Sequence, residues 1–161
     1  MFRVLFVCHG NICRSPMAEL VLRDMAAKQG CSGAFEIASR ATSAEELGNP
    51  VYPPARRVLA RHGISCEGKY AVQLQPDDYD RYDYIIGMDS ANLRNMRRLF
   101  GGDPAGKLSL LNEWSGRGGD VADPWYSGDF EATWRDVEAG CVALLAALTA
   151  EEKGRRHSFG T

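Results

Sequence analysis

The chain has 161 residues, of which 45% are hydrophobic and 25% charged, and its formal net charge is −2 at pH 7. This balance is typical of a globular chain with a sizeable core and argues against intrinsic disorder. We therefore predict a single domain at residues 1–150, followed by a flexible tail at 151–161. The small negative charge gives no reason to expect nucleic acid as a partner.

The number of cysteines and the length of the apolar runs indicate in which cellular compartment the protein is expected. Five cysteines without even spacing argue against a secreted disulfide scaffold. The apolar N-terminal run through Val7 is too short for a signal peptide, and no run approaches the roughly 20 residues of a membrane span. We expect a cytoplasmic monomer without membrane or nucleic-acid partners, in a reducing compartment that keeps a reactive thiol usable.

The strand signals come at intervals along the chain. The nearly continuous apolar run Phe2–Val7 predicts a strand that is buried on both faces of a parallel sheet. Phe35–Ser39 alternates and predicts a second strand. Tyr82–Met88 and Lys107–Leu111 are the third and fourth strand candidates.

Helical patterns alternate with these strands. A first helix should end near Gly30, a second should run from about Pro53 to Gly63, and Asp89 can cap a third. The last helix, with Asp129 as its cap, has apolar residues at three- and four-residue intervals: Phe130, Trp134, Val137, Cys141, Leu144, Leu145 and Leu148. Between the fourth strand and this helix, residues 112–128 read as a long, functional loop.

Alternating strands and helices predict the α/β class: three layers, with a parallel sheet flanked by helices on both faces. Ligands of such folds bind beyond the carboxyl ends of the strands. Cys8, which follows the first strand, would lie at that edge.

The stretch after the first strand combines a nucleophile with an anion cradle. Cys8 and Arg14 are separated by five residues, and a helix follows. Helix N-termini and cationic neighbours lower the pKa of a cysteine from about 8.5 to roughly 3.5–7.5. We therefore expect Cys8 to be a thiolate at neutral pH. Gly10 would let the backbone approach an anion closely, and Asn11 tolerates a left-handed turn.

The segment from Val7 to Glu19, VCHGNICRSPMAE, resembles the active-site loop of the low-molecular-weight protein tyrosine phosphatases. The resemblance covers roughly residues 2–148. It implies a four-stranded parallel sheet with strand order 2-1-3-4, and hydrolysis of phosphotyrosine and aryl phosphates through a phosphocysteine, with inorganic phosphate as product and without a cofactor or metal. Phosphotyrosine-containing proteins or peptides would be the partners.

The resemblance also assigns roles. Cys8 would attack phosphorus, and Ser15 would donate a hydrogen bond to its thiolate. Asn11 would fix the loop through hydrogen bonds that include Ser39. The phosphate-binding loop comprises Arg14 together with His9, Gly10, Asn11, Ile12 and Cys13.

Cleavage of a phosphate ester needs an acid for the departing oxygen, and Asp123 is the candidate. The family's acid lies in an Asp-Pro-Tyr run, of which this chain keeps Asp-Pro, while Trp125 replaces the first tyrosine and Tyr126 retains an aromatic side chain. We expect both aromatic residues and Glu45 at the rim of the site. Glu45 and Glu46 stand where many members carry an aromatic wall, and they would repel acidic phosphopeptides.

Plainer interpretations exist for several of these residues. Ser15 would simply cap the first helix, Asp123 would be a turn residue, and Asp89 would be either a helix cap or the counterpart of a family aspartate. Cys13 would lie beside Cys8, where a reversible disulfide would protect the nucleophile from over-oxidation. Three cysteines are expected to be small buried hydrophobes: Cys31, Cys66 and Cys141.

Other functions share parts of this pattern. Arginine phosphatases of the same superfamily carry a threonine at the position that resembles Ile12, and its polar side chain suits a phosphoguanidinium. The apolar side chain of Ile12 suits a tyrosine ring instead. An arsenate reductase would need a relay cysteine, and none occurs between the third strand and Cys141. A cysteine phosphocarrier would need neither Arg14 nor the Asp-Pro acid. No second ligand pair completes a zinc site with Cys8, His9 and Cys13.

Overall fold

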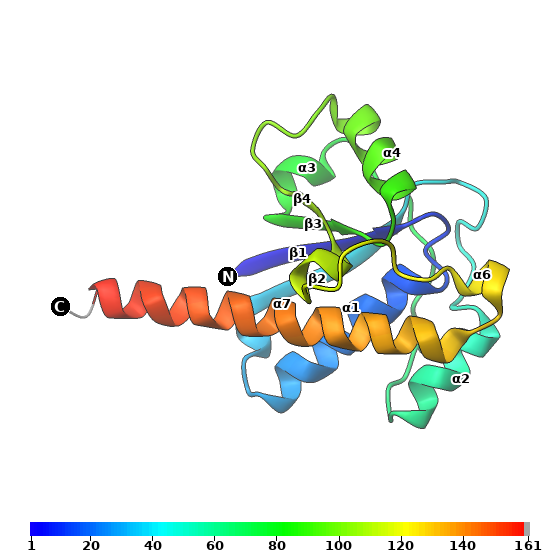
Figure 1. The fold of residues 1–161 in the computed structure, drawn as a ribbon, viewed down its shortest axis with the longest axis horizontal. Coiled ribbons are helices and arrows are strands. Elements are labelled where there is room, and N and C mark those ends of the chain that lie inside the picture. The colour runs from blue at the N-terminus through cyan, green and yellow to red at the C-terminus, as the bar shows by residue number, and fades with distance from the viewer. Residues whose placement is uncertain (160–161) are drawn as a thin grey trace.

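The structure, a computed structural model, describes residues 1–159, and it describes side chains through residue 154. Four parallel strands form one sheet in the order β2-β1-β3-β4 (Figure 1). Their bounds are β1 Phe2–Cys8, β2 Phe35–Ala41, β3 Tyr84–Gly87 and β4 Leu108–Leu110. The α/β class, the parallel sheet and the strand order are confirmed.

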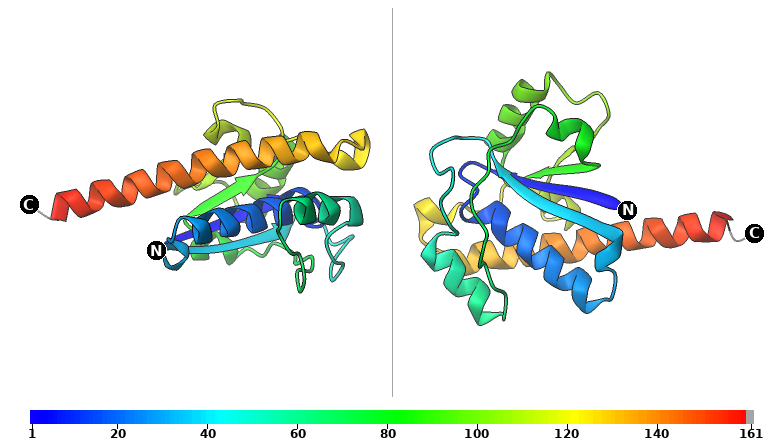
Figure 2. Two further views of the ribbon diagram at one scale, coloured as in Figure 1. Left: turned by 90° about the horizontal axis from the view of Figure 1, so that it is seen from below. Right: turned by 180° about the vertical axis from the view of Figure 1, so that it is seen from behind.

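Helices cover both faces of the sheet (Figures 1 and 2). The larger core lies under α1 (Arg14–Lys28), α2 (Pro53–Arg61) and the long C-terminal α7 (Phe130–Phe159). The smaller core lies on the other face, under α3 (Asp78–Arg81) and α4 (Ser90–Phe100). The predicted three-layer arrangement is therefore present.

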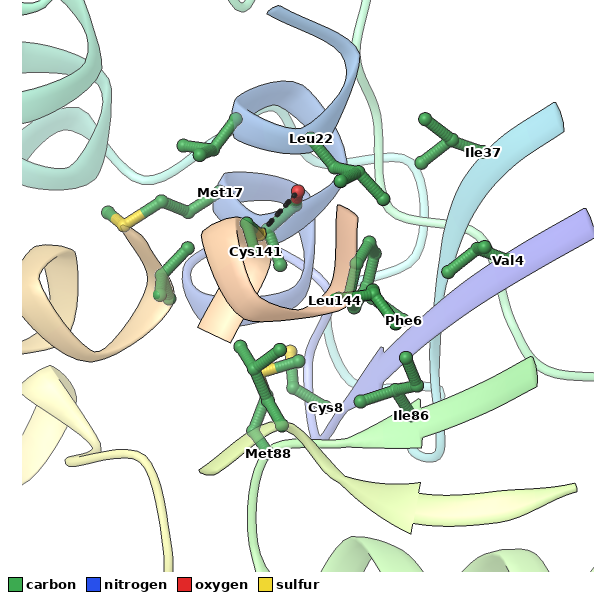
Figure 3. Packing of buried hydrophobic residues seen from close by; sticks show 14 of the residues in the cluster. Val4, Phe6, Cys8, Met17, Leu22, Ile37, Ile86, Met88, Cys141 and Leu144 are labelled. Carbon is green, nitrogen blue, oxygen red and sulfur yellow. Dashed lines mark hydrogen bonds between the residues drawn. The ribbon is translucent and has the colours of Figure 1, made fainter. Parts of the chain in front are cut away.

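Alternation along β1 places the nucleophile. Successive side chains of a strand point to opposite faces, so Phe6 and Cys8 join the larger core while Leu5 and Val7 join the smaller one. Figure 3 shows Cys8 at the end of its strand, near Met88 and below the packed side chains of α1 and α7. The sheet thereby fixes Cys8 at the carboxyl edge.

Helix α7 confirms the apolar pattern and extends it. Its predicted face is buried from Trp134 to Leu148, and Asp129 Oδ1 accepts a hydrogen bond from the Ala132 amide at 2.9 Å. Residues 151–159, predicted as part of a flexible tail, continue the helix because Glu, Lys and Arg are good helix formers. Residues 160 and 161 of that predicted tail lie outside the described residues. No helix within residues 1–159 is long and apolar enough to cross a membrane.

The segment predicted as one long loop contains α6 (Pro124–Ser127) and all of α5 (Leu111–Trp114) except Leu111, which was predicted as the end of the fourth strand. Leu111 packs where Gly140 of α7 has no side chain, which joins α5 to the larger core. A further turn of 3-10 helix lies at Ser32–Ala34. The loop prediction was wrong at α5 and α6, because helices of four residues carry too little periodicity to be recognised.

Candidate active site

The loop between β1 and α1 turns at Asn11. Its φ is +57°, in the left-handed region that was predicted for this residue. The turn directs the Asn11 amide at Cys8 Sγ, 3.3 Å away. Cys8 itself is only 3% exposed, so the sulfur lies on the floor of the loop. The close approach of an anion at Gly10 stays a prediction.

Side chains fix this loop from below. Asn11 Nδ2 donates to Ser15 Oγ and to Ser39 Oγ, both at 2.8 Å, and Asn11 Oδ1 accepts from the Val72 amide at 3.0 Å. Ser15 Oγ lies 2.9 Å from Cys8 Sγ. The helix cap interpretation of Ser15 is wrong, because Cys13 occupies the N-cap position of α1 without a side-chain hydrogen bond.

The network continues to a buried carboxylate that sequence reasoning missed. Ser39 Oγ donates to Glu19 Oε1 at 2.8 Å, and Lys69 Nζ lies 2.9 Å from the same oxygen. Arg23 pairs with Glu19 Oε2 at 2.9 Å. Glu19 is 1% exposed and Ser39 is completely buried. The available signal was that Glu19 follows Ser15 by four residues and shares its helix face.

Arg14 is held by two carboxylates. Its Nη1 donates to Asp89 Oδ2 at 2.8 Å and to the Val121 carbonyl at 3.3 Å, while Nη2 lies 3.4 Å from Asp123 Oδ2. Burial opposes the charge, but the charges of Cys8, Asp89 and Asp123 outweigh it and raise the pKa of Arg14 above its usual range. Arg14 therefore stays cationic inside the site.

The helix-cap interpretation of Asp89 is confirmed, and its correspondence to a family aspartate stays a prediction. Its Oδ1 accepts from the Asn92 amide at 2.8 Å, which makes Asp89 the N-cap of α4. Its Oδ2 accepts from Arg14. One carboxylate thus joins the start of α4 to the guanidinium.

Asp123 faces the loop from the start of α6. Its Oδ1 accepts from the Trp125 amide at 3.0 Å, and its Oδ2 points at Arg14. Asp123 caps this short helix and also lines the cleft that contains Cys8. Its role as the proton donor stays a prediction.

The cleft encloses about 170 Å³, similar to the cavity that holds a benzene ring in a protein interior. Every predicted rim residue lines it, and so do all predicted loop residues except Asn11, which lies beneath. Its lining comprises Cys8, His9, Gly10, Ile12, Cys13, Arg14, Glu45, Glu46, Asp123, Trp125 and Tyr126.

The rim is more exposed than the floor. Trp125 and Tyr126 are 57% and 88% exposed. The Trp125 ring packs against Tyr52 at 5.1 Å between centroids, and the Tyr52 amide donates to the Ile12 carbonyl at 2.9 Å. His9 Nε2 lies 3.2 Å from Glu45 Oε2. Tyr52 was not predicted, although it connects the rim to the loop.

The two loop cysteines differ in chemistry. Burial, with the nearby charges of Cys8 and Asp123, raises the pKa of Cys13 to about 12. Cys13 is therefore a thiol at neutral pH and a poor nucleophile. Within residues 1–159 no group of three or more His, Cys, Asp and Glu side chains is placed to hold a metal ion.

Comparisons with known proteins identify relatives that share most of this chain. A low-molecular-weight protein-tyrosine-phosphatase of Bacillus subtilis, YfkJ, is 39% identical over 155 residues, which cover 95% of this chain and 99% of that protein. A Schizosaccharomyces pombe low-molecular-weight phosphotyrosine protein phosphatase is 42% identical over 129 residues, covering 78% of this chain and 82% of the relative.

Solved structures of similar proteins have the same fold as this chain. The crystal structure of YfkJ superposes with a TM-score of 0.91 at 40% identity, covering 94% of this chain and 96% of that one. The Streptococcus pyogenes enzyme SP-PTP gives 0.85 at 39% identity, with 98% and 99% covered. Residues 3–154 match the family described as low molecular weight phosphotyrosine protein phosphatase. The chain therefore belongs to the low-molecular-weight protein tyrosine phosphatase family.

Proposed function

We propose that this protein tyrosine phosphatase hydrolyses phosphotyrosine and aryl phosphate monoesters through a phosphocysteine at Cys8, and releases inorganic phosphate. The observation that supports this proposal is the convergence of Cys8, Arg14 and Asp123 on one cleft. A nucleophile, an anion partner and a proton donor are the groups that this reaction requires.

The first step is an in-line attack of Cys8 Sγ on phosphorus. The Asn11 amide and Ser15 Oγ orient the sulfur. The guanidinium of Arg14 and the loop amides bind the equatorial oxygens, where charge spreads in the transition state. The loop itself neutralises the phosphoryl oxygens, so the proposal includes no metal or cofactor.

Proton donation requires a change at Arg14. A carboxylate that pairs with Arg14, as Asp123 does at 3.4 Å, has no proton to give. A bound phosphoryl group offers Arg14 Nη2 another acceptor and releases Asp123, and the freed carboxylate takes up a proton from solvent. Asp123 then protonates the leaving oxygen, and as a carboxylate it accepts a proton from the water that hydrolyses the phosphocysteine.

Ile12 supports phosphotyrosine over phosphoarginine as the substrate. Its side chain lines the cleft and is 9% exposed, which gives an aromatic ring an apolar contact. A phosphoguanidinium would find no hydrogen-bond partner on Ile12. Faster turnover of phosphoarginine peptides than of phosphotyrosine peptides would reverse this assignment.

Two substrates with different leaving groups test the roles. Cys8→Ser should abolish turnover of both p-nitrophenyl phosphate and phenyl phosphate. Asp123→Asn should lower kcat/KM for phenyl phosphate by about 10²- to 10⁴-fold. It should lower kcat/KM for p-nitrophenyl phosphate less, because nitrophenolate leaves without a proton.

Asp120→Asn is the matched control. Asp120 lies three residues away and accepts from the Ser90 amide, but it does not line the cleft. Equal losses on both substrates in Asp123→Asn would contradict the proton-donor role. Labelling of the protein without turnover would support a phosphocarrier instead.

A further inference from the structure

A second groove adjoins the active-site cleft at His9. It encloses about 480 Å³, and His9 lines both spaces. The groove runs between the segment after β2 and the outer face of α4, and its other lining residues are Thr42, Ser43, Gln73, Leu74, Asn95, Arg98 and Leu99. A substrate longer than one residue could therefore extend from the cleft across His9 into this groove.

Helix α4 gives this region a positive charge. Arg94, Arg97 and Arg98 are all exposed on it. Among the side chains that the structure describes, none of these three has an acidic partner at ion-pair distance. Only Arg98 of the three lines the groove. A free guanidinium in a groove is a ready partner for a carboxylate.

The groove also offers apolar and amide contacts. Leu99 is 40% exposed and lies beside Arg98 in the lining, while Leu74 is buried beneath the surface. The side-chain amides of Gln73 and Asn95 can donate and accept hydrogen bonds with a peptide backbone. These groups suit an extended peptide better than a small ion.

The charge of the surface reverses between the two spaces. Glu45 and Glu46 line the cleft, whereas Arg98 lines the groove beyond His9. We propose that the groove binds the residues on one side of the phosphotyrosine in a peptide substrate, and that Arg98 selects an acidic side chain there. This proposal rests on the proposed function and names a specificity determinant for it.

Two isomeric phosphotyrosine peptides test the proposal. One carries acidic residues before the phosphotyrosine and basic residues after it, and the other carries them in the reverse order. Their equal net charge removes differences from long-range attraction. Wild-type protein should turn over one isomer with a kcat/KM about threefold to tenfold higher than the other. A ratio of this size is expected when one isomer forms an exposed ion pair with Arg98 and the other places a like charge beside it. The preference should shrink as salt rises.

Arg98→Glu should abolish or reverse this preference and leave kcat/KM for p-nitrophenyl phosphate unchanged, because that substrate does not reach the groove. Arg97→Glu is the matched control. It makes the same charge change on the same helix outside the groove, and the preference should survive it.

Three results would overturn the proposal: equal turnover of the isomers by wild type, a preference that persists in Arg98→Glu, or an equal loss in Arg97→Glu. Absence of p-nitrophenyl phosphate turnover by the wild type is distinguishable from these. It would refute the proposed function, and the peptide groove with it.

Discussion

The two halves of the active site are built differently. The half that carries Cys8 is the cradle, formed by the loop of residues 8–14 and the side chains that support it. Three of its side chains, Asn11, Ser15 and Ser39, are each at most 1% exposed, and Asn11 donates hydrogen bonds to both serines. The half that carries Asp123 is open, and Tyr126 beside it is 88% exposed. The loop around Cys8 is thus fixed by buried contacts, whereas Asp123, the proposed acid, is held by contacts that a substrate can replace.

This difference matches the needs of the reaction. Preorganised donors stabilise transition-state charge because they need no rearrangement during the reaction. In the proposed mechanism Asp123 must change partners, from Arg14 to the leaving oxygen, and an exposed segment allows that movement. We therefore expect changes in the cradle to reduce stability and rate together, and changes in the acid segment to reduce activity with little loss of stability.

The largest effect on stability should come from Glu19→Ala. It leaves Lys69, whose side chain is 14% exposed, without its buried carboxylate partner. Removal of one partner of a buried pair costs about 3–5 kcal/mol, to be measured as the free energy of unfolding in urea. Glu45→Gln, at a side chain that is 72% exposed, is the control and should change it by less than about 0.5 kcal/mol. Similar values for both variants would contradict a rigid cradle.

The next effect should come from Asn11→Ala. This change removes three side-chain hydrogen bonds and places alanine at a φ of +57°. We expect a loss of about 1–3 kcal/mol in the free energy of unfolding, together with a lower kcat. Asn11→Gly restores the backbone freedom but not the hydrogen bonds, so it should recover part of the stability and little of the kcat. Full recovery of kcat would show that only the turn matters.

Alkaline pH should lower the free energy of unfolding through Cys13 in the cradle. The pKa of Cys13 is raised from 9.0 to about 12, so the folded state keeps a proton that the unfolded state loses above pH 9. Its contribution to stability is present below pH 9 and is lost as pH rises towards 12, by about 1.4 kcal/mol per pH unit. Urea unfolding at pH 8, 9 and 10 measures this slope. Cys13→Ala should reduce it, and an unchanged slope would exclude Cys13 as its source.

The smallest effect on stability should come from Trp125→Ala in the acid segment. Trp125 is 57% exposed and its ring packs against Tyr52, so we expect a loss of about 0.5–1 kcal/mol. The KM for a phosphotyrosine peptide should rise, because an aromatic wall of the cleft is lost. A loss of stability as large as that of Asn11→Ala would erase the difference between the two halves.

The predictable parts of the site were the local ones. The turn at Asn11 is a property of that residue and its neighbours, and the Cys8–Arg14 spacing lies within one stretch of chain. The contacts from Asn11 to Ser39 and from Ser15 to Cys8 followed from family resemblance and are present.

The contacts that were missed join distant segments. Lys69 and Val72 reach Glu19 and Asn11 from a stretch without periodicity, whose path is fixed by isolated bridges such as Ala41–Gln73. The continuation of α7 to Phe159 was missed because its last turns carry no apolar stripe. Pattern reasoning therefore found the elements with a buried face and overlooked those that depend on tertiary contacts or polar helix formers.

Covalent catalysis by Cys8 is tested most directly by trapping its intermediate. Asp123→Asn mixed with p-nitrophenyl phosphate and quenched rapidly should accumulate a phosphoryl group, because this variant lacks the carboxylate that accepts a proton from the hydrolytic water. Mass spectrometry of the peptide that contains residues 8–14 should place the added group on Cys8. Steady turnover without any phosphorylated protein, or a phosphoryl group on His9 instead, would contradict the account.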